Sequence, residues 1–241
     1  MTTATYDVAH WSTALAESNY RSQAVQTVTV NDRAATRQAI ISEIRNEKIE
    51  FSERSDWFAQ KNKSSEMIDD WNYTKIAIHH AGRSYRCGPG TSQLLKIQNL
   101  HMANNKWPDI GYHYAIDCSG KIYEGRDIRF KGSHLHEYNT GVIGIVFLEN
   151  LSTPEDSFGD LGLLFSALKK IAGTVDVVIP SIQKNNAAKF ISILRQFFRI
   201  QNLGGHQEFP KQNSSEARLC PGTHGMRLVK ELRTLSKLSP P

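Results

Sequence analysis

The sequence predicts an α/β fold in which a central mixed β-sheet is flanked by helices. Segments with strand-type alternation and segments with helical spacing of apolar residues follow one another along the chain, which is typical of this class. Residues 141–148, GVIGIVFL, are almost wholly apolar, as expected of a central strand that is covered on both faces. With 241 residues, 39% hydrophobic and 22% charged, the chain is long enough for one well-buried core.

The N-terminal half contains a helix, a strand and a second helix in that order. Asn31 is expected to cap a helix over residues 32–48, in which three isoleucines lie on one side. Residues 75–79, KIAIH, alternate as a strand that ends at a histidine. The glycine- and proline-rich loop CGPGTS follows and leads into a predicted helix over residues 92–104.

The rest of the chain completes the sheet and adds further helices. Residues 111–116 and 121–124 are predicted strands, joined at 117–120 by a turn whose glycine suits a hairpin. Helical spacing of apolar residues predicts three more helices, over residues 161–172, 186–200 and 223–237. The apolar stripe of the last helix comprises Leu228, Leu232 and Leu235.

The charge balance indicates an anionic partner. Lysine and arginine outnumber aspartate and glutamate by 29 to 24, a net charge of +5, which favours cell-wall polymers, nucleic acid or anionic lipid. The basic residues are scattered and no DNA- or RNA-binding signature is present, so we expect no nucleic-acid partner. No stretch approaches the roughly 18–20 apolar residues of a membrane span, so we expect no membrane insertion.

The first residues, MTTATYDVAHWSTALAESNYR, lack the basic flank and apolar run of a signal peptide. We therefore expect the protein to be made in the cytoplasm. The three cysteines, Cys87, Cys118 and Cys220, allow one disulfide at most and leave at least one thiol over.

Three residues with metal-binding side chains lie at the ends of regular elements. His79 closes a predicted strand, His206 lies in GGHQEF, and Cys220 lies in LCPG just before the last helix. Neutral imidazole and thiolate are ligands that zinc favours, and three protein ligands leave a fourth position open, as in catalytic zinc sites. On spacing alone, the alternative of two ordinary histidines and an inert buried thiol is favoured.

The order of the motifs favours the zinc site. IAIHHAG, WPDIGYHYAIDCSGKIYEGRD, KGSHLHEYNTGVIGIVFLEN, GGHQEF and LCPG follow one another as in a known family. From about residue 50 to the C-terminus, the chain resembles the zinc-dependent N-acetylmuramoyl-L-alanine amidases of the amidase-2 class. This class includes T7-type phage lysozymes and peptidoglycan recognition proteins.

The resemblance implies a zinc ion bound by His79, His206 and Cys220, in a groove at the strand ends. In a strand, alternate side chains share a face, so His79 points with Ala77 while His80 points the other way. By the same rule Tyr112 and Tyr114 are expected on one face, opposite to His113. The resemblance places Tyr112 opposite the zinc as a catalytic residue.

Four further site residues follow from the resemblance. His134 is expected to stabilise the tetrahedral species or orient the substrate, and Asn139 of the same motif is expected to bind substrate. Arg218, two residues before the third ligand, is expected to supply a fixed positive charge to the oxyanion, because a guanidinium does not deprotonate. Lys211 is its rival for that role and a further substrate-binding residue.

The chain departs from the family pattern in two places. The offset of 14 positions from His206 to Cys220 is longer than the usual one, and residues 151–179 form an insertion. The insertion is interpreted as a helix covering a sheet edge, with a lid or partner surface as the alternative. We therefore divide the chain into an N-terminal extension of unknown role, residues 1–48, and a catalytic domain, residues 49–241.

The resemblance implies hydrolysis of the amide between N-acetylmuramic acid and L-alanine in peptidoglycan. A recognition module that binds peptidoglycan without catalysis is the alternative, against which Cys220 argues. Because this substrate lies outside the cytoplasm, export by a non-Sec route is expected, and an antibacterial effector is favoured over an endolysin. An immunity protein or a secretion apparatus would then be a further partner.

Overall fold

The computed structural model describes residues 32–82, 86–153, 156, 178–212 and 219–241. Within them, six strands form one sheet in the order β1-β4-β3-β5-β2-β6. The strands are β1 (Phe51–Ser52), β2 (Lys75–His80), β3 (Tyr114–Ile116), β4 (Ile122–Glu124), β5 (Val142–Phe147) and β6 (Asn202–Gly205). The α-helices are α2 (Asp32–Asn46), α3 (Gly90–Asn99), α6 (Ser181–Phe197) and α8 (Gly222–Ser236), and shorter helical turns are η2 (Ser64–Glu66), η3 (Leu100–Asn104) and η5 (His206–Glu208).

The sheet is mixed, as the sequence predicts. Strand β2 pairs in parallel with both β5 and β6, and β3 pairs in parallel with β5. Strands β3 and β4 form the predicted antiparallel hairpin, and β1 adds in parallel to the outer edge of β4. Strand β5 is buried throughout, which confirms its prediction as a central strand.

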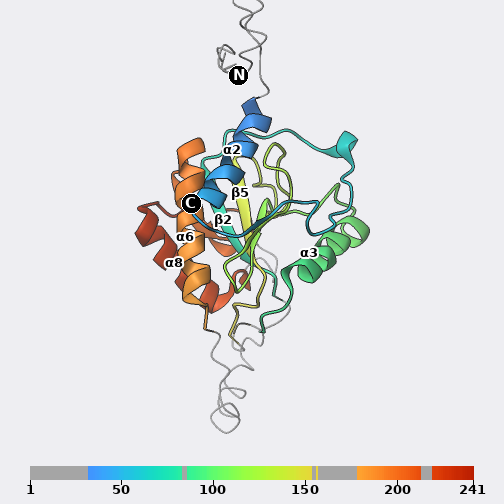
Figure 1. Ribbon diagram of the computed structural model, residues 1–241. Coiled ribbons are helices and arrows are strands. Elements are labelled where there is room, and N and C mark those ends of the chain that lie inside the picture. The colour runs from blue at the N-terminus through green and yellow to red at the C-terminus, as the bar shows by residue number, and fades with distance from the viewer. Residues whose placement is uncertain (1–31, 83–85, 154–155, 157–177, 213–218) are drawn as a thin grey trace, which may run out of the picture.

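Helices cover both faces of the sheet, with α6 and α8 on one side and α3 on the other (Figure 1). On the first face, Ile76 and Ile78 of β2 belong to the main core together with apolar residues of α2, α6 and α8. On the other face, Val146 of β5 packs with Leu94 and Ile97 of α3. The two faces of the sheet therefore serve two different hydrophobic cores.

Helix α2 belongs to the main core, although the sequence places it in the N-terminal extension. Its residues Ile40 and Ile44 are fully buried in that core. On another side of the helix, Arg37 donates a hydrogen bond of 2.5 Å to the buried carboxylate of Glu124 in β4. The described part of residues 1–48 is thus packed against the same sheet as the rest of the chain.

The helix boundaries differ from prediction, most of all at the start of α6. Helix α6 begins at Ser181, five positions before the predicted start, because Pro180 precedes it and its φ suits a helix start. The predicted helix over residues 92–104 is α3 followed by the π-helical turn η3. Leu235, expected on the apolar stripe of α8, is 71% exposed, whereas Leu228 and Leu232 of that stripe are buried. The helix predicted over residues 161–172 lies outside the described residues.

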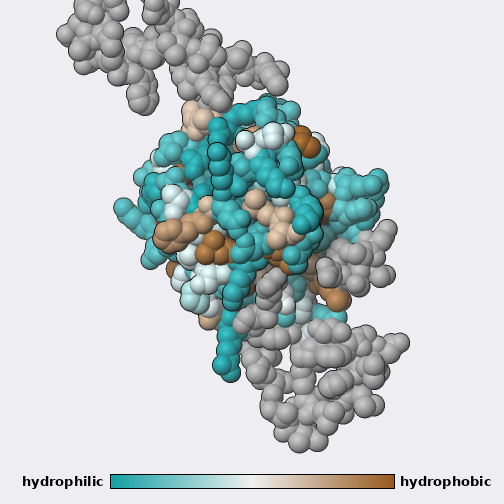
Figure 2. Space-filling model, turned by 90° about the vertical axis from the view of Figure 1, so that its right-hand side faces the viewer, coloured by the Kyte–Doolittle hydropathy of each residue, from teal (hydrophilic) through white to brown (hydrophobic). Residues whose placement is uncertain are grey.

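Cys87 and Cys118 form a disulfide, and Cys220 is a buried free thiol. The bond joins the segment before α3 to the β3–β4 turn. Among the described residues, no helix is long and apolar enough to cross a membrane. The surface on the α3 side is largely hydrophilic, with hydrophobic side chains in small groups rather than in one broad patch (Figure 2).

Candidate metal centre

The pairing of β2 with β6 places two histidines at the same level. These strands are parallel, and their register ends with Ile78 opposite Gly205. The next residues along the two strands are His79 and His206, so both lie at the carboxyl edge of the sheet. Prediction from the sequence missed β6, whose four residues carry two glycines and no strand-type alternation.

A glycine lets the third predicted ligand approach. A Cβ atom at Gly205 would lie 2.8 Å from Cδ of Pro221, too close for any real side chain. The backbone N–H of Gln207 also donates a hydrogen bond of 3.0 Å to the carbonyl of Cys220. These contacts hold the residues before α8 against the turn that follows β6.

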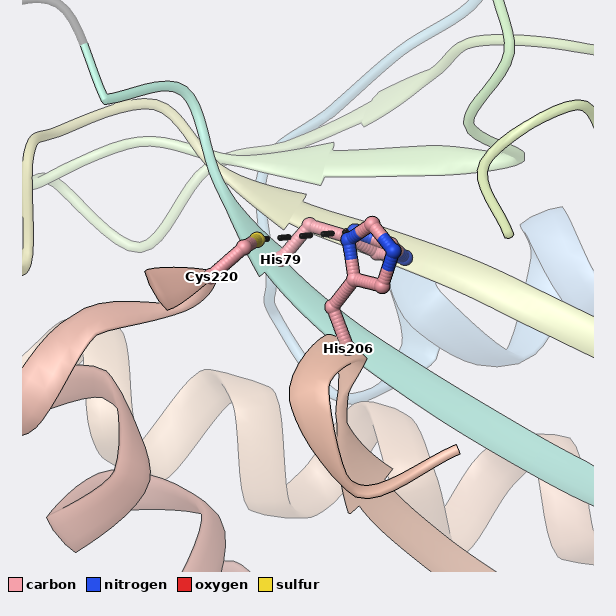
Figure 3. A group of neighbouring side chains, drawn as sticks. All are labelled: His79, His206 and Cys220. Carbon is pink, nitrogen blue, oxygen red and sulfur yellow. Dashed lines mark hydrogen bonds between the residues drawn. The ribbon is translucent and has the colours of Figure 1, made fainter. Parts of the chain in front are cut away.

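His79, His206 and Cys220 converge on one point (Figure 3). One ligand atom of each residue lies within 4.8 Å of those of the other two. The Sγ of Cys220 is 3.7 Å from Nδ1 of His79, and the His79 and His206 ring centroids are 4.7 Å apart. His79 comes from β2, His206 from the start of η5, and Cys220 from the residues before α8.

Burial favours the uncharged form of all three side chains. It lowers the pKa of His79 well below the ordinary value for histidine, and the neighbouring His206 and His134 lower it further. It also lowers the pKa of His206, against a hydrogen bond to the side-chain oxygen of Gln212 that raises it. Burial raises the pKa of the Cys220 thiol to about 12.

The three residues fit a zinc ion. Two neutral imidazoles and a sulfur ligand form a donor set that zinc prefers. In tetrahedral zinc sites a nitrogen ligand and a sulfur ligand are roughly 3.6 Å apart, given Zn–N and Zn–S bonds of about 2.1 and 2.3 Å. The 3.7 Å between Cys220 Sγ and His79 Nδ1 matches that separation.

Tyr112 lies beside this group, with its ring centroid 5.0 Å from that of His79. The expectation that it shares a face with Tyr114 is wrong, because the ring of Tyr114 packs against Phe190 of α6 on the opposite face. Strand β3 begins only at Tyr114, so the alternation does not extend back to Tyr112. Tyr112 belongs instead to the core on the α3 side.

His134 is buried behind His79 and has protein partners at both ring nitrogens. Its Nδ1 is 3.1 Å from Nε2 of His79, and its Nε2 is 3.3 Å from the carbonyl oxygen of Val142. The side-chain oxygen of Asn139 accepts hydrogen bonds from the backbone N–H groups of His134 and Leu135. Asn139 thus holds the turn that carries His134, and its contact with substrate stays a prediction.

Lys211 and Arg218 are the two basic residues expected to stabilise the oxyanion, and the structure describes only the first of them. Lys211 is exposed and forms an ion pair of 3.0 Å with Glu137, so its ammonium group has a partner on the surface. Arg218 lies outside the described residues. Gln212, which the sequence did not single out, is buried, and its Oε1 is 2.9 Å from Nε2 of His206.

The remaining nearby histidines have structural partners. Nδ1 of His80 accepts a hydrogen bond from the backbone N–H of Leu151, as expected for a residue on the other face of β2. Nδ1 of His113 accepts one from Gly144 in β5. Nδ1 of His101 accepts one from Gly111. These bonds hold the segments around the site in place.

Comparison with known proteins agrees with this geometry. The family model described as N-acetylmuramoyl-L-alanine amidase, Amidase_2, matches residues 69–223, which include His79, His206 and Cys220. The chain belongs to this family.

The relatives of this amidase-family chain are peptidoglycan recognition proteins. It is 42% identical over 85 residues to peptidoglycan-recognition protein SC1a of Drosophila melanogaster, covering 33% of this chain and 44% of that protein. It is 33% identical over 100 residues to peptidoglycan recognition protein 3 of Mus musculus, covering 40% and 28%. The chain thus spans less than half the length of these two curated relatives.

Solved structures show the same fold. The crystal structure of Drosophila peptidoglycan recognition protein SD matches with a TM-score of 0.59 at 20% identity, covering 76% of this chain and 94% of that one. Peptidoglycan recognition protein LE, solved in complex with tracheal cytotoxin, matches with a TM-score of 0.56 at 20% identity, covering 76% and 92%.

Proposed function

We propose that this protein is a zinc-dependent peptidoglycan amidase, which hydrolyses the amide between the lactyl group of N-acetylmuramic acid and L-alanine. The observation that carries the proposal is the convergence of His79, His206 and Cys220, with Tyr112 beside them. Peptidoglycan as the substrate is supported by relatives that are peptidoglycan recognition proteins. It is also supported by a structural neighbour solved with tracheal cytotoxin, a monomeric diaminopimelic acid-type peptidoglycan.

The three ligands and Tyr112 divide the chemistry between them. Zinc bound to His79, His206 and Cys220 would supply Lewis-acid chemistry, which polarises an amide carbonyl and lowers the pKa of water. The Tyr112 hydroxyl donates a hydrogen bond to the carbonyl oxygen, which becomes negative when water adds to the carbon. The C–N bond then breaks, the L-alanine nitrogen takes up a proton, and a lactyl carboxylate remains.

A recognition module that binds peptidoglycan without cleaving it is the second candidate, favoured by the names of the relatives. The two candidates differ in what they require of Cys220. A binding module has no need of a buried thiol against a histidine, whereas an amidase needs it as the third metal ligand. The convergence of Cys220 with two histidines therefore favours the enzyme.

We also propose that the protein acts outside the cytoplasm, in the periplasm or cell wall, as an antibacterial effector exported by a non-Sec route. The Cys87–Cys118 disulfide supports this site of action, because such bonds persist in oxidising compartments. An immunity protein and a secretion apparatus are the partners that this role requires.

The decisive experiment incubates the purified protein with peptidoglycan sacculi, with and without a chelator, and identifies the released ends by mass spectrometry. An amidase produces free L-alanine amino termini, and the chelator abolishes them. If the zinc-loaded protein binds sacculi but releases no new amino termini, the recognition module is correct.

The site of action has its own test in a Gram-negative host. Expression in the cytoplasm is expected to be harmless, whereas fusion to a secretory signal is expected to lyse the cells. The His79→Ala version of the fusion is the matched control and is expected to be harmless. Intact cells with a soluble, zinc-loaded wild-type fusion would contradict the lytic role.

A further inference from the structure

The hydrogen bonds behind His79 allow only one arrangement of protons. A backbone carbonyl only accepts hydrogen bonds, so Nε2 of His134, 3.3 Å from the Val142 oxygen, must carry a hydrogen. His134 is buried, and its ring nitrogens face a carbonyl oxygen and another imidazole rather than a carboxylate, so the ring is neutral and its Nδ1 has no hydrogen. Nδ1 of His134 therefore accepts from Nε2 of His79, 3.1 Å away.

This arrangement determines which nitrogen His79 presents to the site. Because Nε2 of His79 carries the hydrogen, Nδ1 of the neutral ring holds a lone pair. That atom is the one that lies 3.7 Å from the sulfur of Cys220. If His79 carried its hydrogen on Nδ1 instead, His134 would have to donate from its own Nδ1. The lone pair on Nε2 of His134 would then face the carbonyl oxygen of Val142 in a buried place, and such a contact between two acceptors is costly.

Two glycines hold the His134 ring in this position. A Cβ atom at Gly144 of β5 would lie 2.5 Å from Cδ2 of His134, and one at Gly132 would lie equally close. The ring thus occupies space that only glycines on both sides leave open. His134 is therefore packed as a fixed support for His79.

The second histidine is supported in the same way by a different side chain. The Oε1 of Gln212 accepts from the backbone N–H of His136, while its Nε2 donates to the carbonyls of His136 and Pro210. These bonds determine which end of the amide is the oxygen. Because that oxygen faces Nε2 of His206 at 2.9 Å, His206 also carries its hydrogen on Nε2.

We propose that His134 and Gln212 are positioning residues that hold His79 and His206 in the Nε2–H tautomer, so that both rings turn Nδ1 toward Cys220. The proposal rests on the zinc site of the proposed function. It changes the role expected of His134, from a group that meets the substrate to a support for a metal ligand. Gln212 lies within the lengthened segment between His206 and Cys220, so this segment supplies one of the two supports.

The first test reads the tautomers directly in the metal-free full-length protein. Long-range ¹⁵N–¹H NMR spectra distinguish Nδ1–H from Nε2–H, and the His79→Ala and His206→Ala variants assign the signals. Both histidines are expected as Nε2–H. An Nδ1–H signal for His79 would overturn the support by His134. This measurement uses neither zinc nor activity, so it decides the proposal even if the protein is no amidase.

The second test compares two variants of nearly equal size. His134→Asn keeps a hydrogen-bond acceptor near the position of Nδ1, whereas His134→Leu has none. Zinc affinity, measured by competition with a chelator, is expected to fall about 10- to 100-fold in His134→Leu. Most of the affinity is expected to return in His134→Asn. Leu235→Asn, which makes the same exchange at an exposed position of α8, is the neutral control.

Equal zinc affinity in the wild type, His134→Leu and His134→Asn would refute the positioning role. If both His134 variants fail to fold, as circular dichroism would show, the tautomers of the wild type still decide. If the wild type binds zinc and shows the expected tautomers but cleaves no peptidoglycan, the proposed function fails and the positioning role stands.

Discussion

Opening the Cys87–Cys118 disulfide is expected to lower the free energy of unfolding by about 3.7 kcal/mol. The two cysteines are 31 positions apart, so the bond closes a loop of that length in the unfolded chain. In the chain-entropy relation, a loop of about 15 residues is worth about 3 kcal/mol and one of about 100 residues about 4.7 kcal/mol. For a protein of this size, the loss corresponds to a melting temperature lower by roughly 7 to 15 °C.

Opening the disulfide is also expected to affect the chain segment that follows β2, the strand that carries His79. The bond connects the chain just after β2, which carries His79, to the turn between β3 and β4. Close by, the Sγ of Cys118 lies 2.9 Å from the carboxylate of Glu149, which is itself bonded to Gln183 of α6. Reduction therefore loosens the attachment of the segment before α3 to the rest of the sheet.

The assay is urea unfolding of metal-free protein, followed by circular dichroism and tryptophan fluorescence. It compares the oxidised wild type, the wild type with reductant, and the double variant Cys87→Ser, Cys118→Ser. The reduced wild type and the double variant are expected to unfold at the same lower urea concentration.

Adding reductant to the double variant is the control, and it should change nothing, because the remaining thiol of Cys220 forms no disulfide in the wild type. The reasoning would be refuted if reductant left the wild-type midpoint unchanged. It would also fail if the double variant lay within about 0.5 kcal/mol of the wild type, the range of an ordinary surface substitution.

Three further predictions concern the site. Cys220→Ser is expected to lose most of its bound zinc, as measured by metal analysis, whereas His80→Ala is expected to keep it because His80 faces away from the site. Stoichiometric zinc in Cys220→Ser would contradict the ligand assignment. Tyr112→Phe should retain its zinc, but its turnover on sacculi should fall by roughly 100-fold or more, which is the usual loss of rate when a positioned hydrogen-bond donor is removed. Unchanged turnover would exclude Tyr112 from the mechanism. Burial lowers the pKa of His113 from 6.5 to about 4, so the stability this neutral ring supplies is complete above pH 6.5 and lost as the pH falls toward 4. At about 1.4 kcal/mol per tenfold change in proton affinity, the loss is about 3 kcal/mol, and a free energy of unfolding that is flat between pH 6.5 and 4 would contradict it.

Much of the fold is predictable because burial patterns are local. Alternation over 75–79 predicts a strand and separates the faces of His79 and His80, and the apolar run at 141–148 predicts a strand covered on both sides. The same reasoning fails at Tyr112, because the backbone there is irregular and the alternation of β3 does not reach it. Strand β6 escaped detection because its glycines carry no pattern.

By itself the sequence determined the α/β class, the main strands and the residues with metal-binding chemistry, since these follow from the side chains of each segment. Only the tertiary structure decided how they meet. The parallel register of β2 and β6 sets His206 level with His79, and the glycine at position 205 lets Cys220 approach. The support behind His79 also comes from a distant loop, the one that carries His134, whereas Gln212 follows His206 closely in the chain. No local pattern encodes such contacts, because the pairing of distant segments is decided by the free energy of the whole packed sheet.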